Sequence, residues 1–291
     1  MHLIVGATGL VGGAVTRQLR DEACDVRALV RGGAGHPAAM SLAQAGVSIV
    51  AGDLGDPAAV ADACKGVDTV VCTATSMPGA VGDALQRVDH DGVLGLIATA
   101  ERAGVRRFVY TSFSANIRVD SPLTQAKRAC EARLAESTME SVILQPSYFM
   151  EVWLGPHLGF DATQARARIY GDGTAGVSYV SALDVAAFAA SAATAPGELR
   201  DVVQIGGPEP VSQLRVVDIF ERTLGRGFAL EHVPIETLEM QHQSGDPLQK
   251  TFAALQMAYA LGDPVAKAPQ TADKYGVQLT TVQHYAMGFR Q

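Results

Sequence analysis

Short apolar runs alternate with longer stretches of helical pattern over the first half of the chain. The runs predict strands at residues 2–5, 25–31, 47–51, 68–74, within 104–114 and at 141–145. Between them, apolar positions recurring every three or four residues predict helices at 14–20, 57–65, 84–103 and 123–137. Strands that alternate with helices in this way are typical of a parallel sheet covered on both faces. The pattern therefore predicts an α/β fold with a doubly wound, Rossmann-type parallel sheet.

The pattern after residue 150 predicts a second, smaller part. Residues 153–157 and 169–173 are typical of loops and hairpins over a cleft, and mostly helix is expected after residue 234. Further strands are predicted at 202–205 and 228–233, and helices at 184–193 and 211–224. Asp184 is expected to cap the first of these helices rather than to catalyse. We therefore expect a Rossmann core at 1–150 and, at 151–291, mainly a substrate-capping part, with returning segments at about 177–206 that complete the core.

A glycine-rich turn joins the first strand to the first helix. Its glycines follow the spacing GxxGxxG, in which Gly6 and Gly9 allow a tight turn close to a diphosphate and Gly12 allows close helix packing. Free amides at the start of the helix then face the anion. The alternative is a tight turn without a ligand. The context, strand before and helix after, predicts a dinucleotide site formed by Gly6, Thr8, Gly9, Leu10, Val11 and Gly12.

Arg31 ends the second predicted strand, where a dinucleotide site meets the adenosine ribose. An NAD site has an acidic residue there, whereas an arginine favours the 2′-phosphate of NADP(H). The alternative is a solvated arginine at the start of the loop expected at 32–37. The sequence therefore predicts NADP(H) as the cofactor.

Polar residues follow the third and fourth predicted strands. Asp53, followed by Leu54, is placed to accept a hydrogen bond from the adenine amino group or to cap the next helix. Ala74 and Thr75 are placed to line the diphosphate, although the threonine hydroxyls there would equally satisfy the turn. We therefore expect the cofactor to be bound in part by Asp53, Leu54, Ala74 and Thr75.

Two further residues are candidates for chemistry. Ser112, at the end of the fifth strand, is placed to hydrogen-bond a carbonyl group or the nicotinamide, or to cap backbone groups of the turn. Lys127 lies in the apolar stripe of the helix at 123–137, where an ammonium group needs polar partners. The nicotinamide ribose and the substrate are the expected partners, with Glu131 as the alternative.

Composition excludes several classes of function. The 291 residues carry a net charge of −7 and no basic block, so nucleic acid is not expected as a partner. No apolar run is long enough to span a membrane, and the first residues already form a core strand, so we expect a cytoplasmic protein. The four cysteines lack metal-site spacing, and no metal is expected. For partners, we expect a small-molecule substrate, with a homodimer as the candidate assembly.

One local cluster resembles a catalytic trio. Asp89, His90 and Asp91 are consecutive in a predicted helix, so their side chains point about 100° apart and cannot converge on one atom. We therefore interpret His90 as a structural or surface residue.

The chain resembles the NmrA-like branch of the atypical short-chain dehydrogenases. The resemblance rests on the glycine turn, on 104–112, on Lys127 with Glu131 and on 144–151, and it continues through 181–186 and 206–211. It implies a Rossmann-type core, a small capping part, a preference for NADP(H), and either reductase chemistry or cofactor sensing without turnover.

One departure from that resemblance affects the expected chemistry. Short-chain dehydrogenases usually carry a tyrosine proton donor four residues before the lysine, and Leu123 stands there. Lys127, Ser112, Tyr148 or water would then supply the proton, and Tyr148 would otherwise pack beside the cofactor. We expect an NADPH-dependent oxidoreductase acting on a small conjugated carbonyl such as a quinone. The alternatives are a non-catalytic NADP(H) sensor that regulates a protein partner and, disfavoured by Leu123, a nucleotide-sugar epimerase or dehydratase.

Overall fold

The computed structural model describes residues 1–35, 37–77 and 79–290, and the chain within it forms two compact units. Unit 1 contains Met1–Ser112, Gln125–Leu144 and Val185–Val203, and unit 2 contains Phe113–Thr124, Gln145–Asp184 and Gln204–Gln291. A late segment thus belongs with the amino-terminal half, while residues 113–124 belong with the second unit. That these units correspond to separate domains stays a prediction.

A seven-stranded sheet forms the centre of unit 1, in the order β10-β6-β5-β4-β1-β2-β3. Its strands are β1 (His2–Val5), β2 (Val26–Val30), β3 (Ser48–Ala51), β4 (Thr69–Cys72), β5 (Arg107–Thr111), β6 (Glu140–Pro146) and β10 (Asp201–Ile205). β1 to β6 all run parallel. In the register, Val5 is level with Leu29 and Cys72, so these strands end along one edge, called here the carboxyl edge. The predicted α/β doubly wound sheet is confirmed.

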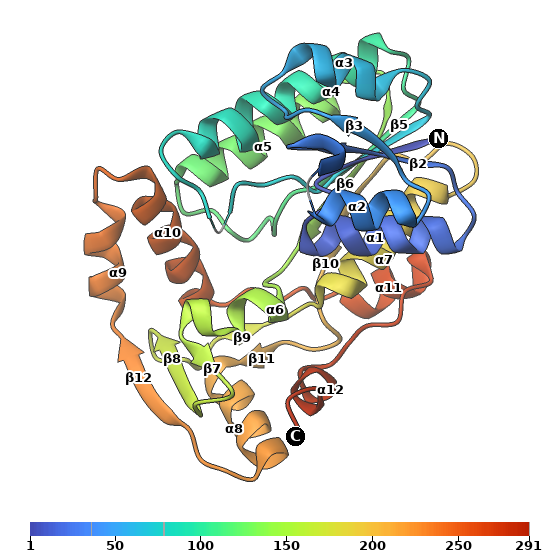
Figure 1. Cartoon of the computed structure of the whole chain (residues 1–291). Coiled ribbons are helices and arrows are strands. Elements are labelled where there is room, and N and C mark those ends of the chain that lie inside the picture. Colours follow the sequence, from blue (N-terminus) through green and yellow to red (C-terminus); the bar gives the residue numbers. More distant parts are fainter. Residues whose placement is uncertain (36, 78, 291) are drawn as a thin grey trace. The chain divides into compact units, whose positions relative to one another are not determined.

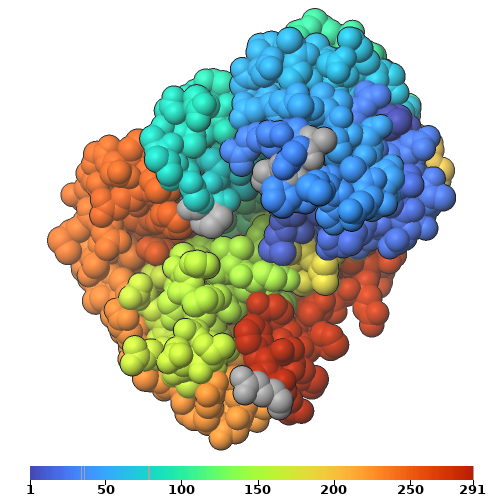
Figure 2. Space-filling view, in the orientation of Figure 1, coloured from blue at the N-terminus to red at the C-terminus, as the bar shows by residue number. Residues whose placement is uncertain are grey.

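Helices cover both faces of this sheet. The helices are α1 (Leu10–Asp21), α2 (Pro37–Gln44), α3 (Pro57–Cys64), α4 (Val93–Arg102), α5 (Pro122–Ala135) and α7 (Ala182–Thr194). Figure 1 shows α3, α4 and α5 on one face and α1, α2 and α7 on the other. The first face forms a buried core in which Leu96 and Ile97 of α4 and Leu134 of α5 pack on strand residues such as Val70. In the space-filling view the amino-terminal strand–helix pairs form one continuous blue surface (Figure 2).

The structure confirms one predicted helix of unit 1 with an added feature and corrects one predicted loop. The helix expected at 84–103 is present, and it consists of a π-helix, η2 (Leu85–Gly92), followed by α4. The loop expected at 32–37 is a 3₁₀ turn, η1 (Gly33–Gly35), and the first residue of α2, with His36 outside the described residues. The proline at the start of α2 favours a first helical turn, a signal that the glycines before it masked.

Unit 2 holds two small sheets. β12 (Ala229–Val233), β8 (Arg166–Tyr170) and β7 (Phe160–Asp161) form one, and β11 (Val211–Ser212) and β9 (Gly176–Val177) form the other. The remaining elements are α6 (Met150–Trp153), η3 (Pro156–Leu158), α8 (Gln213–Leu224), α9 (Ile235–His242), α10 (Pro247–Leu261), α11 (Ala268–Tyr275) and α12 (Val282–Met287). A mostly helical end of the chain is thereby confirmed. Its core is rich in aromatic rings, among them Trp153 and Tyr259, whose ring centres are 4.4 Å apart.

Two expectations in unit 2 are corrected. The helix expected from residue 211 begins at Gln213, because Val211 and Ser212 pair with β9, and the Ser212 hydroxyl caps α8. Asp184 is the third residue of α7 rather than the residue before it, and its carboxylate accepts two 2.8 Å hydrogen bonds from Thr280 as well as one from the Ser181 backbone amide. The first amide of α7, that of Ala182, donates a 3.0 Å hydrogen bond to the carboxylate of Glu151.

Candidate cofactor and catalytic site

The glycine turn packs the end of β1 against the start of α1. Gly6 has φ +96°, a left-handed conformation that favours glycine, and an added Cβ there would lie 2.6 Å from Thr73 Oγ1. An added Cβ on Gly12 would lie 2.2 Å from the carbonyl oxygen of Gly6. The turn closes through a 2.9 Å hydrogen bond from the Gly9 amide to Gly6. The close helix packing predicted for Gly12 is therefore present.

The amino terminus of α1 is open to a ligand. Its cap residue, Gly9, has no side chain to bond the first amides, and the first turn holds no acidic residue. Leu10 is 54% exposed and Val11 is partly exposed, so the backbone at this end is accessible. Unbonded amides and the positive end of the helix dipole bind phosphate well. The Thr8–Gly12 segment thus fits the diphosphate of a dinucleotide.

Arg31 directly follows the last residue of β2 and is exposed at the carboxyl edge. This is the edge at which the glycine turn lies, because β1 and β2 are parallel neighbours in register. An arginine at this position is placed to bind the 2′-phosphate of NADP(H).

Asp53 makes a local turn rather than a helix cap. Its Oδ1 accepts a 2.7 Å hydrogen bond from the Gly55 amide. The cap of α3 is Asp56, whose carboxylate accepts from Ala58 and Ala59 at 3.0 and 3.1 Å. The capping alternative for Asp53 is therefore wrong. Asp53 and Leu54 remain partly exposed just beyond β3, which keeps their proposed adenine-binding role.

The loop after β4 is tied to the π-helix by Asp89, to which the sequence analysis gave no role. Asp89 is fully buried, and its Oδ2 accepts from both the amide and the hydroxyl of Ser76, at 2.9 and 2.5 Å. The Thr75 hydroxyl accepts a hydrogen bond from the Met77 amide, as in the alternative in which the threonine hydroxyls satisfy the turn. Ala74 is partly exposed and Thr75 is exposed. Asp89 thereby fixes the segment proposed to line the diphosphate.

The neighbours of Asp89 behave differently. The ring of His90 contacts Gln86 and Asp91 at 3.0 and 2.7 Å, and Asp91 itself is exposed. These contacts agree with the structural or surface role expected for His90. The only sequence signal for Asp89 was its place in an otherwise apolar helical face, and the π-helical turn that directs it inward is not visible in a local pattern.

Lys127 lies in a buried stripe, as predicted. Leu123, Lys127, Cys130 and Leu134 of α5 are all at most 6% exposed. The Lys127 ammonium donates to the carbonyl oxygen of Thr111 at 3.2 Å and lies 5.1 Å from the centre of the Tyr110 ring. An ammonium has three donors, and these two contacts at the end of β5 direct it toward the carboxyl edge.

Ser112 directly follows β5, and its side chain bonds to a charged group on α5. Its hydroxyl donates to Glu131 Oε1 at 2.5 Å, and the Arg128 guanidinium donates to the same oxygen at 2.6 Å. The alternative in which Ser112 merely caps the turn is not supported by these contacts. Sequence reasoning had placed Glu131 only as a partner of Lys127.

Tyr148 lies in the aromatic core of unit 2. Its hydroxyl donates to the carbonyl oxygen of Leu255 at 3.1 Å, and its ring packs edge-on against Trp153 at 4.6 Å. Burial raises the pKa of Tyr148 well above its usual value, which disfavours ionisation. These contacts favour the packing alternative over a catalytic role.

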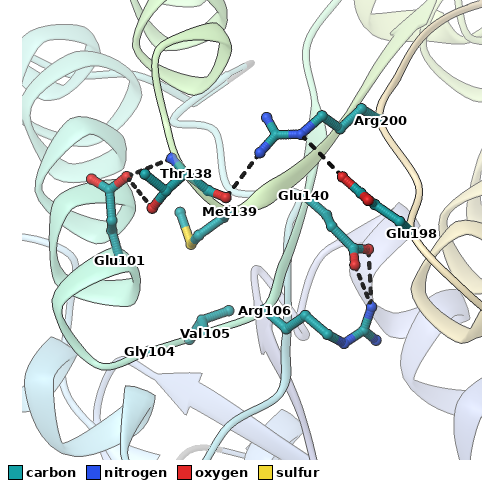
Figure 3. Close-up of a pocket in the computed structure, with 9 residues that line it drawn as sticks. All are labelled: Glu101, Gly104, Val105, Arg106, Thr138, Met139, Glu140, Glu198 and Arg200. Carbon is teal, nitrogen blue, oxygen red and sulfur yellow. Dashed lines mark hydrogen bonds and ion pairs between the residues drawn. The ribbon is translucent and has the colours of Figure 1, made fainter.

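A hollow in unit 1 of about 360 Å³ lies at the opposite edge of the sheet, near the starts of β5 and β6. Figure 3 shows that its charged side chains pair with one another: Arg106 lies 2.9 Å from Glu140 and Arg200 lies 3.9 Å from Glu198. Arg200 also donates to the Thr138 carbonyl at 2.8 Å. Ligands of doubly wound sheets bind at the carboxyl ends of the strands. This hollow is therefore separate from the proposed cofactor site.

The described residues contain neither a metal-ligand cluster nor a membrane-spanning helix. Within residues 1–35, 37–77 and 79–290, no three His, Cys, Asp or Glu side chains are grouped as metal ligands. No helix in that part of the chain is long and apolar enough to cross a membrane. The cysteines are free thiols, and burial raises the pKa of Cys64 to about 11 and of Cys72 to about 12.

Comparison with known proteins identifies the family. The family model described as NmrA-like matches residues 2–285. This chain belongs to the NmrA-like family. The resemblance predicted from the glycine turn, Lys127 and Glu131 is thereby confirmed.

Several of the proteins that this chain resembles are named as reductases. An NAD(P)H azoreductase of Xenophilus azovorans is 30% identical, with 91% of this chain and 88% of that protein covered. A (4-alkanoyl-5-oxo-2,5-dihydrofuran-3-yl)methyl phosphate reductase of Streptomyces griseus is 31% identical, with 89% and 86% covered. The NADPH-dependent quinone oxidoreductase QOR2 of Escherichia coli, solved with NADPH, has the same fold, with a TM-score of 0.79 at 22% identity over 99% of both chains.

Proposed function

We propose that this protein is an NADPH-dependent reductase of small conjugated acceptors such as quinones. The observation that carries the proposal is the arrangement at the carboxyl edge of unit 1. Three features there support it: an uncapped helix start, an exposed arginine at the end of β2 and a buried lysine on α5. Dinucleotides bind doubly wound sheets at this edge. The reaction class predicted from the sequence, NAD(P)H-dependent oxidoreduction, and the predicted cofactor are confirmed by the named relatives.

The residues present fit the cofactor. Gly6 and Gly12 leave no room for a Cβ, which keeps the turn tight, and the first amides of α1 have no side-chain cap and would bind the diphosphate. Arg31 would bind the 2′-phosphate, Asp53 and Leu54 the adenine side, and Ala74 and Thr75 the far side of the diphosphate. The bound cofactor supplies the hydride.

The substrate class follows from the proton donors at hand. Leu123 occupies the position four residues before Lys127, so no phenol is available there, and Lys127 is the cationic donor on α5. Reduction of a simple ketone needs a strong proton donor as the alkoxide forms, whereas a conjugated acceptor spreads the developing charge over several atoms. The azo group and the unsaturated lactone in the names of two relatives are also conjugated acceptors.

The test is anaerobic single-turnover oxidation of enzyme-bound NADPH with a panel of quinones, followed by the absorbance of the reduced nicotinamide. We expect acceptor-dependent loss of that absorbance with the quinones and none with matched saturated ketones. Tight NADPH binding without any acceptor-dependent loss would contradict the proposal and favour the sensor alternative. Loss with ketones and quinones alike would contradict the proposed substrate class alone.

A further inference from the structure

The hydroxyl proton of Ser112 already forms a hydrogen bond to Glu131 within unit 1. Its oxygen lies 2.5 Å from Glu131 Oε1, and the same Oε1 receives a 2.6 Å bond from Arg128. A guanidinium only donates, so this carboxylate oxygen is an acceptor and Ser112 must be the second donor. The charge-assisted bond holds the serine rotor in one orientation.

A hydroxyl with its proton committed offers a ligand only its lone pairs. Ser112 was expected to bond either a substrate carbonyl group or the nicotinamide. A carbonyl oxygen has no proton to give, whereas the carboxamide of the nicotinamide carries two N–H donors. Of the two alternatives, the observed bond from Ser112 to Glu131 is compatible with the second.

We propose that Glu131, supported by Arg128, fixes Ser112 as an acceptor that binds the carboxamide N–H of the nicotinamide. This inference rests on the proposed function, because it needs NADP(H) at the carboxyl edge. Glu131 is then a positioning residue that acts through Ser112. Donation to the oxygen of the hydride acceptor is left to Lys127, whose ammonium donates one proton to the Thr111 carbonyl oxygen and carries two more.

The test compares the equilibrium binding of two oxidised cofactors by calorimetry. One is NADP⁺, and the other is its 3-acetylpyridine analogue, in which a methyl group replaces the carboxamide NH₂. We expect the wild-type protein to bind NADP⁺ several-fold tighter, about fivefold for one neutral hydrogen bond. In Ser112→Ala that ratio should fall toward one, because the acceptor is gone.

Variants of Glu131 separate positioning from bulk structure. In Glu131→Ala the serine proton is freed and can turn to the acetyl oxygen of the analogue, so the ratio should also fall toward one. In Glu131→Gln the amide oxygen can still accept from Ser112 and Arg128, so a ratio near the wild-type value is expected. A general loss of packing would weaken the binding of both cofactors equally and leave the ratio unchanged.

The chain offers a matched control. Ser137 donates to Glu101 at 2.7 Å, and Glu101 also pairs with Arg133, which repeats the serine–glutamate–arginine arrangement near the start of β6. Ser137→Ala should therefore leave the cofactor ratio at the wild-type value.

Each outcome decides a different statement. A wild-type ratio that persists in Ser112→Ala, or a wild-type ratio of one, overturns the inference while leaving the proposed reductase intact. Absence of any NADP⁺ binding by the wild-type protein overturns both. A ratio lost in Ser112→Ala and Glu131→Ala but kept in Glu131→Gln and Ser137→Ala supports the inference.

Discussion

A Cβ atom on Gly12 would lie 2.2 Å from the carbonyl oxygen of Gly6, so α1 approaches the end of β1 more closely than any other residue at position 12 allows. The close approach of α1 to the Gly6 carbonyl oxygen sets the shape of the glycine turn, because neither can move without displacing the other.

We therefore expect Gly12→Ala to weaken NADPH binding at least tenfold and to destabilise the protein by about 1–3 kcal/mol, as overpacking does. Calorimetric titration and thermal unfolding measure the two effects. The control is Gly95→Ala on α4, where an added Cβ meets nothing within 4 Å and helix propensity should raise stability by up to about 1 kcal/mol. Unchanged NADPH affinity in Gly12→Ala would show that the turn does not hold the diphosphate.

Arg31→Glu tests the choice of cofactor. Removing a charge-assisted bond worth about 1.5–3 kcal/mol should weaken NADPH binding about ten- to a hundredfold and spare NADH. Dissociation constants for both cofactors measure this. Arg222→Glu, an exposed arginine of α8, makes the same change of charge and should alter neither. An equal loss of affinity for both cofactors would mean that Arg31 does not bind the 2′-phosphate.

Lys127→Met tests the proposed proton donor. Loss of a positioned donor should lower kcat for quinone reduction by at least about 100-fold. The melting temperature should not fall, because a well-packed apolar chain replaces an ammonium that is costly to bury. The control is Lys65→Met, a lysine whose side chain is 75% exposed. Turnover at the wild-type rate in Lys127→Met would exclude this lysine as the donor.

Glu101→Gln tests an electrostatic contribution to stability. Hydrogen bonds from the Ser137 hydroxyl, from Arg133 and from the Thr138 amide lower the pKa of Glu101 from 4.5 to about 2. The ionised carboxylate therefore stabilises the folded state above about pH 4.5, and this contribution is lost as the pH falls toward 2. Urea unfolding should show the wild-type protein more stable than the variant at neutral pH, with a smaller difference near about pH 3. A difference that does not change with pH would contradict this assignment.

Arg107→Met tests a buried cation. Arg107 is fully buried and donates to the carbonyl oxygens of Ala192, Ala195 and Gly197 at 2.7–2.8 Å and to Glu140 at 2.7 Å. Removing it leaves these acceptors without their donor and should cost about 3 kcal/mol of unfolding free energy. Arg106→Met is the neighbouring control, since that side chain is 43% exposed and should cost at most about 1 kcal/mol. Equal losses of unfolding free energy in the two variants would contradict the prediction that the buried arginine contributes more to stability than the exposed one.

The sequence alone determined the fold class, the glycine turn and the buried stripe of α5. Each of these is a local pattern: alternation of strand and helix, three glycines at fixed spacing, and apolar residues on one helical face that includes Lys127. Such patterns fix the backbone path and the face that a residue presents, and they therefore placed the proposed site residues of unit 1 near the ends of parallel strands.

The tertiary structure decided which group each polar side chain contacts. Arg107 reaches carbonyl groups 85 to 90 residues away, and Ser112 reaches Glu131 across 19 residues. Asp89, in the π-helix, is buried and accepts from Ser76, and Asp184 accepts from Thr280, 96 residues away in the chain. Hydrogen-bond partners depend on the packing of segments that are distant in the sequence, and a local sequence pattern carries no information about that packing. For this reason the direction of the Ser112 proton, on which the cofactor inference rests, could be obtained only from the folded chain.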